Sequence, residues 1–192
     1  MANEFVLRRA IDADCIALSQ LAQQTFRETY IEDLAVPYSE HVVETYFRSS
    51  KTPEWYANKI ADPLRAVWII EDKLNKNDEL VAFLIACQCN LPHVDVCLGK
   101  DGEIEYLYVR RDRQSYGLGK RLINEAISWI QERYGERPIW LATMSCNLKA
   151  QKYYTKNYSF IQVGEYSKNI GEYEQKEIIM KREHNYIVEI QD

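Results

Sequence analysis

Long apolar runs are absent from this sequence of 192 residues. No stretch of about eighteen mainly apolar residues is available to span a bilayer, and the first residues lack the charged and apolar regions of a secretion signal. We therefore expect a cytoplasmic protein without a membrane partner.

Cysteine and histidine are scarce and poorly spaced for metal binding. The five cysteines include no C-x-x-C pair, and the three histidines, His41, His93 and His184, lie far apart. Zinc sites and disulfide frameworks in small proteins depend on closer spacings. The sequence thus predicts no metal cofactor, and the cysteines fit best as small buried hydrophobic residues.

Repeats, linkers rich in proline or serine and a surplus of positive charge are also missing. The formal net charge is −5, which argues against a nucleic-acid surface and suits a cationic ligand. With 46% hydrophobic residues the chain is long enough for one core. We expect one domain over residues 1–183 and a short tail at 184–192.

Helix and strand patterns alternate along the chain. A helix with Asp12 as its N-cap is predicted to run to about Tyr30, and others are expected after Ser39, from Pro53, from Gly117 to an αL cap at Gly135, and from Asn147. Strands are expected at 5–10, 65–72, 79–90, 103–109 and 138–144, and on both sides of a turn at 169–171. This order predicts an α/β protein with a central mixed sheet and helices on both faces.

The stretch RQSYGLGK lies between a strand and a long amphipathic helix. Gly117 and Gly119 allow the backbone to approach a ligand at a helix N-terminus, where unpaired N–H groups bind phosphate. Basic residues gather around it: Arg110, Arg111, Arg113, Lys120 and Arg121. The pattern matches neither a P-loop nor a dinucleotide fingerprint. It favours phosphate binding over the alternative, in which the glycines serve only tight helix packing.

Two motifs together resemble the GNAT superfamily of N-acetyltransferases. Gln114-x-x-Gly117-x-Gly119 is similar to its Q/R-x-x-G-x-G/A motif, and Asn147-x-x-Ala150-x-x-Tyr153-Tyr154 to its N-x-x-A-x-x-F/Y-Y motif. The segments TFRETY (25–30), IWL (139–141) and GEY with IIMKRE resemble the PaiA-type polyamine branch. The turn after Tyr154 departs from the family pattern, because it has one extra residue and Ser159 instead of glycine before Phe160.

The resemblance implies a GNAT fold, mostly antiparallel, whose splayed strand pair holds acetyl-CoA as cosubstrate. The backbone of Leu107, Tyr108 and Val109 would then pair with the cosubstrate, and an N–H near Val109 would polarise the thioester. Asn147 would contact the pantetheine, and either Lys156 or the arginines near the loop would contact the 3′-phosphate. The pyrophosphate would bind the loop of Gln114, Ser115, Tyr116, Gly117, Leu118, Gly119 and Lys120.

The catalytic candidates are Glu103 and Tyr154. Glu103 matches the strand position of a general base in some members of the family, although many members deprotonate the amine through water. Tyr154 matches a phenol that protonates the departing thiolate. Strand alternation predicts that Glu103 and Glu105 share a face with Leu107 and Val109, where the two carboxylates would attract a cation. The alternatives to these roles are structural: the two glutamates would face solvent, and Tyr154 would pack in the core.

The acceptor amine is expected to be small, with polyamines preferred. Phe26, Tyr30 and Glu105 are candidate substrate contacts, and the other candidates are Glu28, Glu32, Asp33, Trp55 and Tyr56. The alternatives are a protein or peptide amine, or a regulator that binds acyl-CoA without catalysis. We expect a small-molecule partner and no nucleic acid, and the sequence is compatible with a homodimer.

Overall fold

The computed structural model describes residues 5–74 and 79–184. The turn predicted between the strands at 65–72 and 79–90, and all of the expected tail except His184, lie outside the described residues. Within the described part, no helix is both long and apolar enough to cross a membrane.

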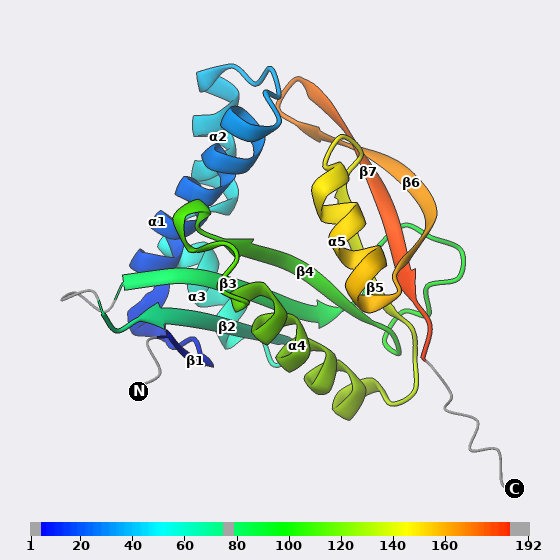
Figure 1. Cartoon of the computed structure of the whole chain (residues 1–192). Coiled ribbons are helices and arrows are strands. Elements are labelled where there is room, and N and C mark those ends of the chain that lie inside the picture. Colours follow the sequence, from blue (N-terminus) through cyan, green and yellow to red (C-terminus); the bar gives the residue numbers. More distant parts are fainter. Residues whose placement is uncertain (1–4, 75–78, 185–192) are drawn as a thin grey trace, which may run out of the picture.

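A seven-stranded sheet runs through the molecule in the order β1-β2-β3-β4-β5-β7-β6 (Figure 1). The neighbours are antiparallel except for β4 and β5, which are parallel, so the predicted mixed and mostly antiparallel sheet is confirmed. The strands are β1 Phe5–Arg9, β2 Arg65–Asp72, β3 Glu79–Gln88, β4 Gly102–Val109, β5 Ile139–Met144, β6 Ile161–Ile170 and β7 Tyr173–Arg182.

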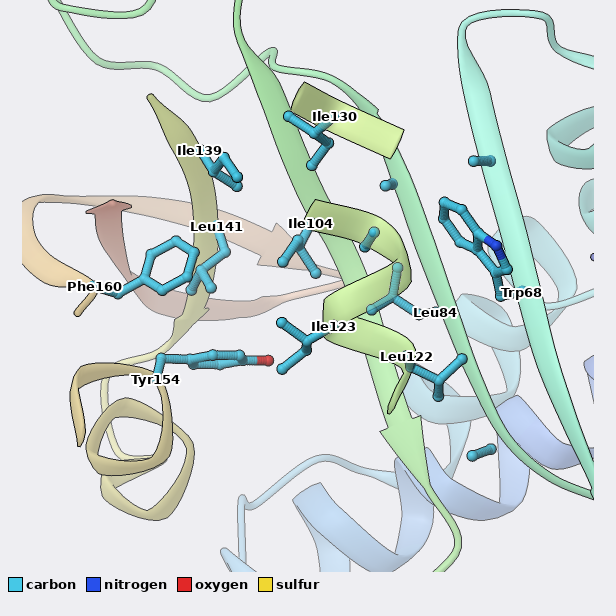
Figure 2. Packing of buried hydrophobic residues seen from close by; sticks show 14 of the residues in the cluster. Trp68, Leu84, Ile104, Leu122, Ile123, Ile130, Ile139, Leu141, Tyr154 and Phe160 are labelled. Atoms are coloured by element: carbon cyan, nitrogen blue, oxygen red, sulfur yellow. The ribbon is translucent and has the colours of Figure 1, made fainter. Parts of the chain in front are cut away.

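Helices cover both faces of the sheet, as predicted. They are α1 Cys15–Phe26, α2 Glu40–Ser50, α3 Pro53–Ala61, α4 Leu118–Tyr134 and α5 Leu148–Tyr158, with short helical turns η1 Asp12–Asp14, η2 Arg27–Asp33 and η3 Arg111–Arg113. One apolar cluster joins α1 and α3 to β2 and β3. A larger one joins α4 and α5 to the opposite face, where Leu122, Ile123 and Ile130 of α4 pack over Ile104 and Leu84 (Figure 2).

Most predicted helix ends are confirmed. The side chain of Ser39 accepts a hydrogen bond from Val42 N, and that of Asn147 accepts one from Ala150 N. The prediction of Asp12 as an N-cap is wrong, because the Asp14 carboxylate takes the N–H of Ile11 instead. The helix to Tyr30 is correct in extent, but its last turn, η2, is π-helical. Gly135 has φ +68° and ψ −149°, a glycine conformation outside the predicted αL region.

The two parallel strands separate soon after they meet. Gly102, Glu103 and Ile104 of β4 pair with residues 139–141 of β5, and the β5-facing edge of β4 is unpaired beyond them among the described residues. β5 turns instead to β7, with which it pairs along its whole length. The sheet therefore splays open at the C-terminal end of β4.

A β-bulge in β4 overturns one prediction. Ile104 lies opposite Ala86 and Tyr106 opposite Ile85, so Glu105 is the extra residue. The bulge shifts the alternation by one residue. Leu107 and Val109 consequently pack on the α4 face, whereas Glu105 reaches Lys59 of α3 on the other face. The carboxylates of Glu103 and Glu105 do not share a face with Leu107 and Val109.

Gly102 of β4 lies in close contact with α4. A Cβ at this position would lie 2.4 Å from Cγ2 of Ile130 and 3.1 Å from Cδ2 of Tyr134. We expect Gly102→Ala to lower the free energy of unfolding by about 1–3 kcal/mol, as measured in urea. Ile130→Ala in the same chain should recover part of that loss, and strict additivity of the two changes would contradict this packing.

Candidate active site

A cleft of about 1200 Å³ lies where β4 and β5 separate. Its walls include Leu107 and Val109 on the α4 side and Tyr30 and Tyr108 on the α1 side, with residues of α4, α5, β5, β6 and β7 completing it. The cleft thus passes through the sheet and joins its two faces. It exceeds the volume of an ordinary small-molecule pocket.

The free edge of β4 presents main-chain groups to this cleft. Arg110 donates its N–H to Val81 O of β3 at 2.9 Å. Since successive peptide groups of a strand point to opposite edges, the N–H groups of Val109 and Leu107 point away from β3, into the gap. Backbone from an extended ligand can pair with them, as an added strand would.

The glycine loop forms another wall. Gly117 has φ +76° and precedes α4, and a Cβ there would meet open space. The N–H groups of the first helical turn have no partner within the helix, so they can accept an anion at the cleft. Lys120 and Lys149 also line the cleft and supply positive charge, and Lys149 Nζ donates to Gln114 Oε1 at 2.8 Å.

The arginines near this loop form internal ion pairs. Arg110 pairs with Glu79 and Asp112, and Arg113 pairs with Asp72 and Asp112. Arg121 donates to the carbonyl oxygen of Phe5. The expectation that the whole basic group serves as counter-charge therefore needs correction, because these arginines fix the loop and leave Lys120 and Lys149 for an anion.

Three acids predicted near the substrate bind Arg111 instead. Its guanidinium contacts Glu32 and Asp33 at 2.7 and 2.8 Å, and its backbone N–H donates to Glu28 at 2.9 Å. Asp33 still lines the cleft, but its charge is shared with Arg111. These bonds clamp η2 to the segment that precedes the glycine loop. They position two walls of the cleft relative to each other.

Glu103 lies in the cleft as a buried acid. Its side chain accepts the N–H of Asn90 at 3.2 Å, and the residue is 8% exposed. Burial raises the pKa of Glu103 to about 7, the charge of Glu105 adds to the rise, and the Asn90 bond opposes it. A carboxyl group with this pKa gains and loses a proton near neutral pH, as a general base must.

Glu105 has a different environment. It forms ion pairs with Lys59, at 2.7 Å, and with Arg65. Its carboxylate is therefore held by two cations of the protein, although Glu105 also borders the cleft. The prediction that Glu105 attracts a substrate cation is weakened, because its charge is balanced within the protein.

Tyr154 lies in the core between the two separating strands. Its ring packs on Tyr153 and Phe160, and Figure 2 shows its hydroxyl directed from α5 toward Ile123. Tyr154 also lines the cleft, and burial raises the pKa of its phenol, which stays protonated. The altered turn preserves this packing, because Ser159 adopts the αL conformation (φ +58°) that glycine would take.

Most predicted site residues line the cleft, namely Tyr30, Glu103, Glu105, Leu107, Tyr108, Val109, Gln114, Ser115, Gly117, Leu118, Gly119, Lys120, Asn147 and Tyr154. Three do not. Phe26 is buried in the cluster of α1 and α2, Tyr116 is exposed and packs on Phe5, and Lys156 is exposed on α5. Trp55 and Tyr56 belong to α3, pack in the apolar cluster with α1, β2 and β3, and are not among the residues that line the cleft.

Sequence reasoning pointed to the last hairpin as a determinant of substrate choice but singled out none of the residues that line the cleft from it. Tyr166, Lys168 and Glu177 line the cleft from this side. The hairpin tip reaches the segment that precedes α2 (Figure 1), where Tyr173 packs on Tyr38 with ring centroids 4.8 Å apart. The one available signal was Glu177 itself, an acid directly before the apolar residues Ile178 and Ile179 in a predicted strand.

Known structures share this architecture. PaiA N-acetyltransferase from Thermoplasma acidophilum, in complex with coenzyme A, has a TM-score of 0.68 at 18% identity over 93% of this chain and 98% of that one. Ribosomal-protein-S5-alanine acetyltransferase from Vibrio fischeri has a TM-score of 0.63 at 15% sequence identity, and the match covers 96% of each chain. NAA60 from Arabidopsis thaliana, in complex with a bisubstrate analogue, has a TM-score of 0.64 at 18% sequence identity. The match covers 94% of this chain and 99% of that one.

At these identities the structural likeness establishes the fold, whereas the family rests on the sequence. The model of the acetyltransferase (GNAT) family matches residues 25–160. That match spans most of the chain, including the glycine loop and the α5 motif. The protein belongs to the GNAT family of acetyltransferases.

Proposed function

We propose that this protein transfers the acetyl group of acetyl-CoA to the primary amine of a small cationic acceptor, with polyamines preferred. One observation carries the proposal: a free strand edge, a helix N-terminus and a buried acid with a pKa of about 7 meet in one cleft. The volume suits a cosubstrate on the α4 side and an amine on the α1 side. The similarity to PaiA N-acetyltransferase, whose structure contains coenzyme A, supports the proposal of a cosubstrate in the cleft.

The residues fit the cosubstrate by shape and charge. Its pyrophosphate would bind the first turn of α4 with Lys120 and Lys149, and its extended arm would pair with Leu107 and Val109. The acetyl thioester supplies an activated carbonyl carbon. The N–H of Val109 would donate to the carbonyl oxygen, which becomes more negative as the amine attacks.

Glu103 prepares the acceptor. A free alkylamine with a pKa near ~10 is almost entirely ammonium at neutral pH and cannot attack. Glu103 takes one proton, and the neutral nitrogen then forms the C–N bond while the C–S bond breaks. The nitrogen loses a second proton, which the thiolate gains, and Tyr154 donates a hydrogen bond to that sulfur. No covalent enzyme intermediate is needed.

The test is a screen of acceptors for CoA release from acetyl-CoA. We expect release with linear polyamines, less with amino acids, and least with peptides that begin with alanine. Peptides as the best acceptors would favour protein acetylation, which is the reaction named for one structural relative. Tight acetyl-CoA binding without release for any amine would instead indicate a non-catalytic regulator.

Gly117→Val should weaken acetyl-CoA binding about tenfold or more, because a β-branched side chain at φ +76° distorts the loop and fills the approach to it. Titration calorimetry measures the Kd. Gly99→Val is a matched control, since Gly99 has φ +77°, also meets open space and does not line the cleft. Equal affinities in the two variants would refute the assignment of the loop.

A further inference from the structure

An ion pair of unequal burial lies on the wall that β6 and β7 contribute to the cleft. Nζ of Lys168 on β6 is 2.6 Å from Oε1 of Glu177 on β7, and both residues line the cleft. The Glu177 side chain is 4% exposed, whereas that of Lys168 is 46% exposed. The anion is therefore fixed within the wall, and the cation reaches it from solvent.

The Glu177 carboxylate is held in place independently of Lys168. Gln175, itself buried, donates from Nε2 to Oε1 of Glu177 and accepts the hydroxyl of Tyr38. Tyr38 belongs to the segment that leads into α2, so the hydrogen bonds tie the hairpin to that segment. Departure of Lys168 would leave the carboxylate correctly oriented.

The energetics of the pair are asymmetric. A buried carboxylate without a cation is strongly destabilised, so Glu177 is most stable with a positively charged partner. Separation of an exposed lysine from its partner costs little free energy, because water solvates the ammonium group. A cation that enters the cleft can thus replace Lys168, whereas a neutral group cannot.

We propose that Glu177 anchors a second ammonium group of the acceptor, and that Lys168 occupies this anchor until the acceptor displaces it. The inference rests on the proposed function and sharpens its substrate class: a linear amine with at least two protonated nitrogens. One nitrogen reacts beside Glu103, and the other binds Glu177. Tyr166 of β6 lies opposite Glu177 in the sheet, and both residues line the same cleft as Glu103.

The experiment compares diaminobutane with butylamine, which has the same carbon chain and one nitrogen fewer. In Lys168→Met the internal competitor is gone, and we expect the KM for the diamine to fall about tenfold with kcat nearly unchanged. In Glu177→Gln we expect that KM to rise about tenfold. The KM for butylamine should change less than twofold in either variant. Lys176→Met, an exposed lysine of β7 outside the cleft, is the control.

The outcome separates this inference from the proposed function. If the KM values for both amines change in parallel, or if the KM for the diamine is unchanged in both variants, Glu177 is not the anchor. The proposed acetyl transfer would be unaffected by that result. If the wild type releases no CoA with any amine, the proposed function fails. The anchor is then tested by calorimetry, in which Lys168→Met should bind diaminobutane more tightly than the wild type and Glu177→Gln more weakly. Equal binding by all three would refute it.

Discussion

Glu103→Gln should lower kcat/KM for amine acetylation by about 10²-fold at pH 7, at the lower end of the contribution of a positioned general base. The amide keeps the size of the carboxyl group but cannot accept a proton from the acceptor. In the wild type the rate should rise with pH and level off above the Glu103 pKa of about 7. In Glu103→Gln the rate should no longer rise with pH in this range. If the rise persists, the general base is a group other than Glu103.

The same substitution should stabilise the fold at high pH. The pKa of Glu103 is raised in the folded protein, so its favourable contribution is complete below the ordinary value of 4.5 and is lost as the pH rises through about 7. Above that pH the buried carboxylate costs on the order of 3 kcal/mol relative to an uncharged group. Glu103→Gln should therefore raise the thermal midpoint at pH 8 and change it little at pH 4.

Tyr154→Phe should lower kcat by about 10²-fold and leave the Kd for acetyl-CoA nearly unchanged. The hydroxyl serves the leaving sulfur, whereas the ring supplies the packing against Phe160, which phenylalanine retains. Stopped-flow or steady-state measurements of CoA release give kcat, and calorimetry gives the Kd.

Tyr153→Phe provides the matched control for Tyr154. Tyr153 is the adjacent residue of α5, also lines the cleft, and would lose the same hydroxyl. We expect its kcat to fall less than threefold. Equal losses in the two variants would mean that the phenols act through general packing, and Tyr154 would have no separate role in catalysis.

Local patterns explain why the fold was predictable. Ser39 and Asn147 begin helices by bonding the N–H three residues later, a relation contained within four residues of sequence. The strands β2 and β3 are apolar on both faces because helices cover both, and such runs are visible without a structure. The glycine loop and the α5 motif likewise carry their signals locally.

The parts that were missed depend on contacts between distant segments. The bulge at Glu105 arises from its register against β3, and no residue type in β4 signals it. Arg111 binds acids of η2 that precede it by about eighty residues, which reassigns three predicted substrate contacts. Glu177 reaches the cleft because β7 inserts between β5 and β6, an order that local patterns do not encode.

The central claim is that acetyl-CoA pairs with the free edge of β4. Residue-resolved amide hydrogen exchange, measured by NMR with and without acetyl-CoA, tests it most directly. The N–H groups of Leu107 and Val109 should exchange markedly more slowly with acetyl-CoA present, whereas Tyr108, whose N–H already faces β3, should change little. Unchanged exchange at Leu107 and Val109 under saturating acetyl-CoA would contradict the account.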